Sequence, residues 1–335
     1  MTTRAITVIG GGPAGCAAAL AALAEGAGVT LYEKSHFPRH KVCGEFLSPE
    51  ILAVFESLGL RDAFFSARPA RLSRAVLRMG SREKHFPLPQ PAFSLSRYAL
   101  DRLLLDAAVQ RGAEVKMETR RADEASGVPV VIAHGRQAPA PKGGRLFGFK
   151  AHFRGPVEDS VEMFFSRGGY VGVSPVEDGA VNVCGLAPEE LLRAEGFRPE
   201  ALFPDALRLR LAPLERSFDW LVTGPLVFHK KFDRPAEAYL AGDALGFIDP
   251  FTGSGIVSAL ATGKLAGRSA AREVPVADCH AQCRRILGRQ YGLSTLMRRA
   301  LSDGLTAEIM LYVAQWIPGP LLYRLTRPAV GKALA

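Results

Sequence analysis

The sequence predicts an α/β protein in which a parallel sheet is interleaved with a β-rich domain and followed by C-terminal helices. A short apolar run at residues 6–9 leads through a Gly-rich turn into a helix of small residues at 16–25. A second strand, turn and small-residue helix spans residues 238–270. Between these units, residues 71–88 and 148–226 alternate in the manner of strands and contain Gly and Pro turns. The chain therefore leaves the first sheet for a second one and then returns.

The first Gly-rich turn has the spacing of a Rossmann-like dinucleotide-binding unit. Gly10 permits a tight turn, Gly12 lets a pyrophosphate approach the backbone, and Gly15 lets the helix pack closely on the strand. The helix N-terminus adds unpaired N–H groups and partial positive charge for the phosphates. Glu33 ends the next apolar run, at residues 29–32, where a carboxylate can hydrogen-bond both hydroxyls of an adenosine ribose. Together these features predict a bound dinucleotide.

Length and composition fit a folded protein in a reducing compartment. The 335 residues suffice for one large or two medium domains, and 48% apolar with 22% charged residues is ordinary globular usage. The net charge of +9 comes from dispersed arginines rather than blocks, which argues against nucleic acid as a partner. No charged and then apolar leader precedes the first strand, and the five cysteines lack regular spacing, so we expect a cytoplasmic protein.

Three residues with metal-binding side chains stand close together near the C-terminus. Cys279, His280 and Cys283 can share one helix face. No fourth ligand follows at a suitable spacing, so we interpret them as ordinary helix residues and expect no metal.

The segment after Glu33 is a loop with clustered cations and a glycine, a composition suited to contact with a phosphorylated ligand. Ser48 is the predicted N-cap of a helix with Pro49 at its first position, and Gly59 is its predicted end. Residues 97–108 have the apolar spacing of an amphipathic helix that packs on the nucleotide domain. The remaining expected elements are strands at residues 113–117 and 129–133, the second ending at His134-Gly135, and a helix at 188–195.

The second Gly-rich unit combines an acid with a helix N-terminus. Its strand ends at Gly242-Asp243, and Gly253 and Gly255 precede a helix at residues 256–270. An Asp at a strand end can accept hydrogen bonds from a polyol chain, and a helix N-terminus can stabilise negative charge on a heteroaromatic ring. A flavin needs both, because it has a ribityl chain and a reduced ring that is anionic. The unit therefore indicates a flavin.

These motifs together resemble the FAD-dependent oxidoreductases of the aromatic hydroxylase fold, and within them the geranylgeranyl reductase-like branch. The similarity spans nearly all of residues 5–275. The run Lys41-Val42-Cys43-Gly44-Glu45 is similar to the Cys-Gly loop of that branch, and Gly169-Tyr170…Pro175…Asn182-Val183 is similar to its substrate-domain signature. The resemblance implies bound FAD, NADPH or NADH as the electron donor, and a lipophilic small molecule as substrate.

The resemblance also assigns residues to the parts of the cofactor. It implies that Glu33 binds the adenine ribose, Arg97 the cofactor from the side, and Asp243 the ribityl chain. The full set of implied cofactor contacts is Gly10, Gly12, Pro13, Ala14, Gly15, Glu33, Lys34, Cys43, Gly44, Arg97, Gly242, Asp243, Pro250, Gly253, Gly255 and Ile256. The implied substrate contacts are Tyr170, Gly172 and Ser174. Cys43 is the candidate catalytic residue, because a thiol beside the flavin can gate the site or donate a proton; its alternative is a small buried hydrophobe.

The sequence departs from the family pattern in three places. His134-Gly135 stands where the family usually has Asp-Gly, which weakens a scheme with efficient nicotinamide reduction. Gly172 and Ser174 replace bulky aromatic residues of the reductase signature, so we expect a wider pocket than a prenyl-chain tunnel. The connection between residues 115 and 130 is short for this fold, which suggests fewer connecting strands.

Three functions remain open on the sequence. The altered signature favours a monooxygenase that hydroxylates a lipophilic aromatic or polyketide-like compound. The alternatives are an FAD-dependent reductase of isoprenoid double bonds and a flavin-binding protein without turnover. Flavin performs the redox chemistry itself, so the protein need not present a catalytic triad or a metal.

The chain is expected to divide into interleaved domains and a tail. The FAD-binding domain is expected to comprise residues 1–70 with 92–140 and 233–275, the substrate domain residues 71–91 with 141–232, and the C-terminal helical region residues 276–335. The tail has two apolar stripes at helical spacing, flanked by arginines and too short to span a membrane. We expect the stripes to pack on the body of the protein; weak peripheral association with an anionic bilayer is the alternative.

Overall fold

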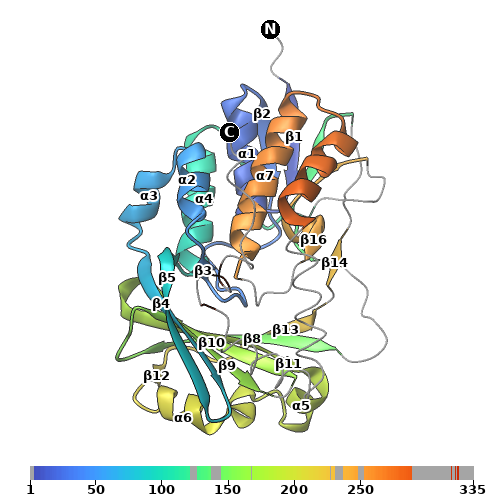
Figure 1. Cartoon of the computed structure of the whole chain (residues 1–335). Coiled ribbons are helices and arrows are strands. Elements are labelled where there is room, and N and C mark those ends of the chain that lie inside the picture. Colours follow the sequence, from blue (N-terminus) through green and yellow to red (C-terminus); the bar gives the residue numbers. More distant parts are fainter. Residues whose placement is uncertain are drawn as a thin grey trace.

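The computed structural model describes residues 4–120, 127–136, 145–166, 168–226, 228–230, 237–247 and 253–288, together with residues 318, 321 and 323. Two β-sheets dominate this part of the chain: the parallel sheet and the helices beside it form one half of the molecule, and the larger, mixed sheet forms the other (Figure 1). The chain passes between the two sheets more than once, as the alternation of sequence patterns predicts.

The nucleotide-binding sheet is parallel throughout, in the order β15-β7-β1-β2-β6. Its strands are β1 (Ala5–Ile9), β2 (Gly28–Tyr32), β6 (Glu114–Lys116), β7 (Val130–Ile132) and β15 (Tyr239–Leu240). The chain passes from β1 through α1 to β2, which pairs with one side of β1, while β7 pairs with the other side. The strand order therefore reverses between β1 and β7. Ligands of open parallel sheets bind outside the carboxyl ends at such a point. Gly10 and His134 stand at that edge.

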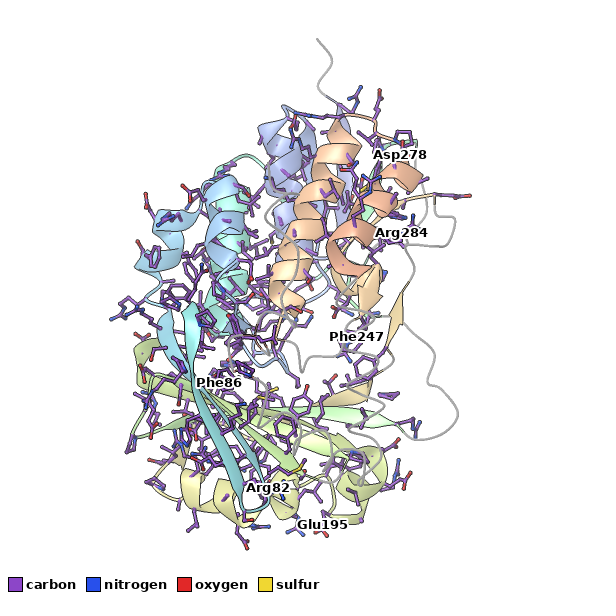
Figure 2. All side chains as sticks on the ribbon, in the orientation of Figure 1. Arg82, Phe86, Glu195, Phe247, Asp278 and Arg284 are labelled. Carbon is purple, nitrogen blue, oxygen red and sulfur yellow. The ribbon has the colours of Figure 1, made fainter. Side chains whose placement is uncertain are left out.

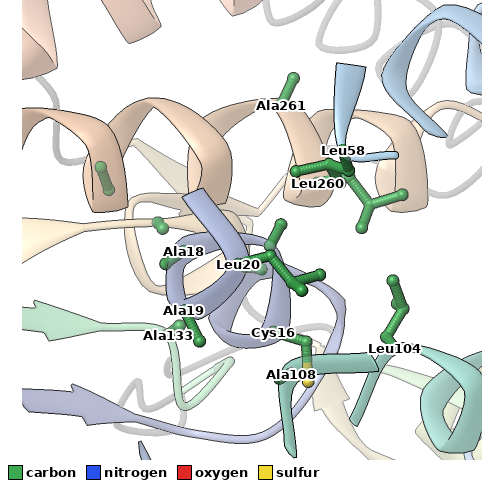
Figure 3. Close-up of a cluster of buried hydrophobic side chains, with 14 of the residues drawn as sticks. Cys16, Ala18, Ala19, Leu20, Leu58, Leu104, Ala108, Ala133, Leu260 and Ala261 are labelled. Carbon is green, nitrogen blue, oxygen red and sulfur yellow. The ribbon is translucent and has the colours of Figure 1, made fainter. Parts of the chain in front are cut away.

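The helices of this domain pack through unusually small side chains. They are α1 (Pro13–Ala24), α2 (Ile51–Ser57), α3 (Arg61–Ser66), α4 (Arg97–Gln110) and α7 (Gly255–Ala271). A β-carbon on Gly263 would lie 2.1 Å from the Ala14 carbonyl oxygen, and one on Gly267 would lie 2.0 Å from that of Ala18. Figure 3 shows α7 crossing over α1. Glycine and alanine in both helices therefore allow their backbones to touch.

The mixed sheet has the order β12-β8-β11-β10-β9-β4-β5-β3, with β13 also paired to β8. Its strands are β3 (Phe46–Leu47), β4 (Ala70–Met79), β5 (Arg82–Ser94), β8 (Leu146–Arg154), β9 (Ser160–Ser166), β10 (Gly169–Pro175), β11 (Ala180–Pro188), β12 (Glu215–Arg216) and β13 (Leu221–Leu226). A separate pair joins β14 (His229–Lys230) to β16 (Gly246–Phe247). Short 3₁₀ turns are η1 (Glu177–Gly179), η2 (Pro199–Leu202) and η3 (Gly242–Ala244).

One face of the mixed sheet is covered by the helices α5 (Glu189–Ala194) and α6 (Asp205–Leu211). Phe149, Val171 and Val183 point to that side and form a core with Leu207 and Leu211. Because side chains alternate along a strand, the intervening residues of β8, β10 and β11 face the nucleotide-binding domain. This second face carries the polar groups of the candidate site.

Ser48 is not the helix N-cap that the sequence predicts. The helix α2 begins at Ile51 with Glu50 as its N-cap, two residues later than expected. The reason is that β3 pairs with β5 immediately before Ser48, so the chain leaves the sheet through a turn in which the Ser48 carbonyl accepts from the Ile51 N–H (2.9 Å). The Ser48 hydroxyl is buried and makes no hydrogen bond.

The first part of the C-terminal region packs on the nucleotide domain. Residues 276–288 form a helix that places Cys279 and Cys283 in the same core as α1 and α7. His280 accepts a hydrogen bond from the Leu240 N–H (3.0 Å), which ties this helix to β15. The apolar stripes predicted further along the tail lie outside the described residues. Within the described part, no helix is both long and apolar enough to cross a membrane.

Candidate functional site

The first Gly-rich turn has space for a phosphate at one glycine only. Gly10 has a positive φ of 108°, and a β-carbon there would lie 2.6 Å from the Ala133 carbonyl oxygen. At Gly15 a β-carbon would lie 1.7 Å from the Gly10 carbonyl oxygen. At Gly12 the nearest atom would be an Arg97 guanidinium nitrogen at 3.8 Å. The backbone is therefore closely packed at Gly10 and Gly15, whereas Gly12 leaves space beside the turn. This space suits a ligand that approaches the backbone.

The open glycine is the N-cap of a helix. Gly12 precedes Pro13 in the first turn of α1, and among the described residues no side-chain hydrogen bond caps this helix end. Glu33, 3% exposed, accepts hydrogen bonds from the N–H groups of Gly11 (2.7 Å) and Ser35 (2.8 Å). Its carboxylate is thus fixed beside the turn. Uncapped N–H groups and a fixed carboxylate fit the pyrophosphate and ribose of a dinucleotide.

Two cations adjoin this turn. Arg97 is buried and makes a bidentate ion pair with Asp101 (2.6 and 2.7 Å); burial opposes its charge, but Asp101 outweighs burial and raises the pKa of Arg97. Burial lowers the pKa of Lys41 to about 8, with further lowering from Arg97 and Arg39, and Asp101 and Asp243 partly oppose this. Arg97 is already paired with Asp101, so a pyrophosphate would chiefly compensate Lys41. Lys34 is exposed at the strand end.

The second Gly-rich unit closes against the first. Gly242 has a positive φ of 57°, and a β-carbon there would lie 2.9 Å from the β-carbon of Ala14. Asp243 follows in the 3₁₀ turn η3, half-buried. Gly253 also has a positive φ and approaches Phe46, whereas a β-carbon on Gly255 would meet no atom of the described residues within 4 Å. Ile256 is buried in the first turn of α7, and Pro250 lies outside the described residues.

His134-Gly135, in place of the usual acid, is followed by an arginine that the sequence reasoning missed. The His134 ring bonds the Gly135 carbonyl (3.0 Å). Arg136 lies over the Phe247 ring at 4.8 Å and feels the charge of Asp243; burial lowers its pKa. This edge therefore carries a cation, Arg136, two residues after the position where the family usually has an acid. In the sequence, only the position of Arg136 shortly after the end of β7 could have indicated that it belongs to the site.

The loop at residues 41–45 packs on the inner face of the mixed sheet. A β-carbon on Gly148 would meet Val42 at 3.0 Å, so this glycine of β8 makes room for the loop. The Asn182 side-chain amide donates to the Cys43 carbonyl (3.2 Å) from β11. The Cys43 sulfur accepts from the Glu45 N–H (3.4 Å) and also interacts with the Arg97 guanidinium. Cys43 and Arg97, distant in sequence, are therefore brought together.

The three predicted substrate residues share this inner face. In the register of β10 and β11, Tyr170 pairs with Leu186, Gly172 with Cys184, and Ser174 with Asn182. Space above Gly172 is partly taken by Met163, whose sulfur lies 3.3 Å from the position of an added β-carbon. The widening expected from a missing aromatic side chain is therefore smaller than the sequence suggests.

An apolar cluster joins Tyr170 to the nucleotide-binding domain. Leu186 and Leu226 of the mixed sheet contact Phe247 of β16, with Tyr170 and Phe228 packed against them. Figure 2 shows Phe247 at the edge of the nucleotide domain that faces the mixed sheet. This cluster supplies an apolar wall within the same interface as Cys43.

Comparison with known proteins agrees with this geometry. Residues 2–138 match the family described as FAD binding domain, and the residues of the turn fit that cofactor. The chain is an FAD-dependent oxidoreductase.

It is similar to two groups of curated reductases. Digeranylgeranylglycerophospholipid reductase 2 of Methanopyrus kandleri is 28% identical, with 82% of this chain and 79% of the relative covered. Menaquinone reductase of Mycobacterium tuberculosis is 25% identical, with 96% and 88% covered. Menaquinone reductase of Mycolicibacterium smegmatis is 34% identical, but the matched part is 37% of this chain and 31% of the relative.

Solved structures share the fold. The flavin-dependent brominase Bmp2 has a TM-score of 0.74 at 18% identity, with 97% of this chain and 93% of that chain covered. HpxO of Klebsiella pneumoniae, complexed with FAD and uric acid, has a TM-score of 0.74 at 18% identity, with 96% and 95% covered. The predicted α/β fold, with its parallel FAD-binding sheet and β-rich second sheet, is thereby confirmed.

Proposed function

We propose that the chain is an FAD-dependent reductase that saturates a carbon–carbon double bond of an isoprenoid lipid. The observation that carries this proposal is the apolar wall of Phe247, Leu186 and Leu226 in the same interface as the Cys43 loop. An apolar wall suits a hydrocarbon chain rather than a polar substrate. The names of the relatives, which include a phospholipid reductase with geranylgeranyl chains, support the same substrate class. This reverses the preference for a monooxygenase that the altered signature suggested.

The residues around the turn would hold the cofactor in one orientation. The first turn of α1 and Glu33 would bind the pyrophosphate and adenine ribose, while Asp243 would bind the ribityl chain. When bound, FAD supplies hydride transfer, with NADPH or NADH as the donor. Gly253, Gly255 and the N-terminus of α7 would face the ring, since no atom of the described residues lies within 4 Å of a β-carbon placed at Gly255.

Cys43 would supply the proton that a saturated bond requires. Saturation of a double bond adds a hydride to one carbon and a proton to the other, so a donor must lie near the second carbon. The Cys43 thiol lies on the inner face of the sheet, beside Arg97. The apolar wall would exclude water, so that protons come from this side chain rather than from solvent.

An anaerobic experiment tests the reductase. The bound flavin is photoreduced without oxygen, and a geranylgeranyl lipid or menaquinone is added. We expect the flavin to be reoxidised and a product with two additional hydrogens to appear by mass spectrometry. C43S should keep FAD and lose most of this reaction, whereas C279S, which alters a buried thiol of the C-terminal helix, should keep both. Absence of reoxidation by any prenyl lipid would contradict the proposal.

Hydroxylation of a lipophilic aromatic or polyketide-like compound is the second candidate. Gly172 and Ser174 favour it, because small side chains at these positions leave more room for a ring than aromatic ones do. Met163 takes part of that room. The same experiment separates the two candidates, because hydroxylation requires oxygen and adds an oxygen atom to the product.

A further inference from the structure

Glu45 is a buried carboxylate on a strained backbone. It is completely buried, and its φ of 56° lies in the left-handed region that residues with a β-carbon seldom adopt. Gly44, which could adopt this conformation without strain, precedes it directly. Strain of this kind persists only where surrounding contacts over-determine the conformation, and it is concentrated at functional sites. The contacts of the carboxylate therefore explain why a glutamate occupies this position.

Three groups from two segments, β8 and the start of α4, converge on this carboxylate. Lys150 Nζ and His152 Nε2 (2.7 Å) of β8 contact its two oxygens, and the backbone N–H of Arg97, at the start of α4, donates to it at 2.6 Å. The Glu45 carbonyl accepts from the Leu95 N–H (3.2 Å). Lys150 is itself fully buried. One side chain thus joins the Cys43 loop, residues 41–45, to the mixed sheet and to the nucleotide-binding domain.

The carboxylate is ionised at neutral pH. Burial alone would raise the pKa of Glu45, but Lys150 and His152 outweigh burial and hold its pKa below the usual value. Loss of one partner in a buried ion pair leaves the other charge uncompensated, which is more costly than loss of a surface pair. The side chains of Glu45, Lys150 and His152 therefore act as a unit.

The neighbourhood of this unit contains further titratable groups. His40 lies edge-on to His152 with ring centroids 5.0 Å apart, and it stacks on Tyr98. Burial lowers the pKa of His40 to about 4, with help from the charges of Lys150 and His152. Cys184 of β11 pairs with Lys150 in the strand register, and burial raises the pKa of its thiol. At neutral pH, His40 and Cys184 are thus uncharged.

The unit fixes the residue that carries the proposed proton. Cys43 stands two positions before Glu45, and its sulfur accepts from the Glu45 N–H. The Cys43 carbonyl is bonded to Asn182 of β11, and its thiol interacts with Arg97, whose own N–H is bonded to Glu45. Each contact that orients Cys43 therefore involves Glu45 or a segment that Glu45 joins to the loop.

We propose that Glu45 is a positioning residue: its carboxylate, bound by Lys150, His152 and the Arg97 N–H, holds the Cys43 loop against the mixed sheet and orients the Cys43 thiol. The inference rests on the proposed function only in taking Cys43 as the reacting group. The attachment of the loop to the mixed sheet can itself be measured without substrate or turnover.

The test compares alkylation rates of individual cysteines in the FAD-bound protein by mass spectrometry. E45G removes the carboxylate and also relieves the backbone strain, while E45Q/K150M removes both charges at nearly constant volume. We expect Cys43 to react at least tenfold faster in both variants, while buried Cys16 and Cys279 remain as slow as in the wild type. A general loss of stability would instead accelerate all three. E189Q, which weakens a pair with Arg145 and Arg193 at the outer side of the mixed sheet, is the matched control and should leave Cys43 unchanged.

Two results would overturn the proposal. One is a wild-type rate at Cys43 in E45G and in E45Q/K150M, which would mean that the carboxylate does not hold the loop. The other is equal acceleration of Cys43, Cys16 and Cys279, which would reduce Glu45 to a contributor to stability. The alkylation rates do not depend on turnover, so a negative result in the reductase assay would refute the proposed function without refuting the role of Glu45.

Discussion

The contact between α1 and α7 allows the position of the cofactor to be tested with two alanine substitutions. Gly263 faces the Ala14 carbonyl in the first turn of α1, and Gly267 faces the Ala18 carbonyl one turn further along. An added β-carbon would lie 2.1 Å from the first oxygen and 2.0 Å from the second, although such contacts essentially never fall below 3.0 Å. Each substitution must therefore separate the helices by about 1 Å, at a cost of about 1–3 kcal/mol typical of overpacking.

The two variants should differ in FAD affinity. G263A displaces the turn whose N–H groups are proposed to bind the pyrophosphate, and a hydrogen bond to a charged group contributes about 1.5–3 kcal/mol. Its Kd for FAD should rise at least about tenfold, which corresponds to 1.4 kcal/mol. G267A displaces a turn remote from that ligand and should change the Kd by less than about threefold.

Urea unfolding of the FAD-free protein measures the stability loss, and quenching of flavin fluorescence measures the Kd. G288A is the control, because within the part of the chain that the structure describes a β-carbon there meets nothing within 4 Å, and alanine favours a helix over glycine. Equal Kd values for G263A and G267A at equal loss of stability would refute the placement of the pyrophosphate at the N-terminus of α1.

Three further variants test other parts of the site. E33Q turns an acceptor into a donor beside two N–H groups, so its Kd for FAD should rise about 10–150-fold; an unchanged Kd would restrict Glu33 to shaping the turn. The pKa of Lys41 is about 8 in the free protein, and a bound anion favours the protonated amine, so FAD binding takes up a proton at higher pH. The Kd should rise above pH 8, approaching about tenfold per pH unit, and K41M should remove this slope; a wild type with a flat profile would disprove it. G172W must displace Met163 and should exclude bulky ligands more than slender ones, whereas equal loss of both would indicate a backbone role for Gly172.

Local patterns predicted most of the nucleotide-binding domain. The glycines at 10, 12 and 15 and the small residues of α1 and α7 specify turns and close packing through contacts that the backbone geometry itself imposes. The strands β4 and β5 likewise follow from alternation around a Gly turn. The turns and the runs of small residues are visible in the local sequence, so periodicity and spacing are enough to locate them, although the α1–α7 contact itself joins distant segments.

Long-range contacts could not be predicted in this way. Lys150 and His152 alternate with Phe149 and Ala151 in β8, a pattern that any strand with one polar face would show. Their partner Glu45 lies more than a hundred residues earlier, and nothing in either segment encodes the pairing. Ser48 was misassigned for the same reason, because the pairing of β3 with β5 decides where α2 begins.

The structure of the FAD complex tests the central claim most directly. We expect the pyrophosphate against Gly12 and the first turn of α1, the adenine ribose at Glu33, and the isoalloxazine between the Cys43 loop and the N-terminus of α7, facing the mixed sheet. A ring bound elsewhere, or a pyrophosphate remote from Gly12, would contradict the account.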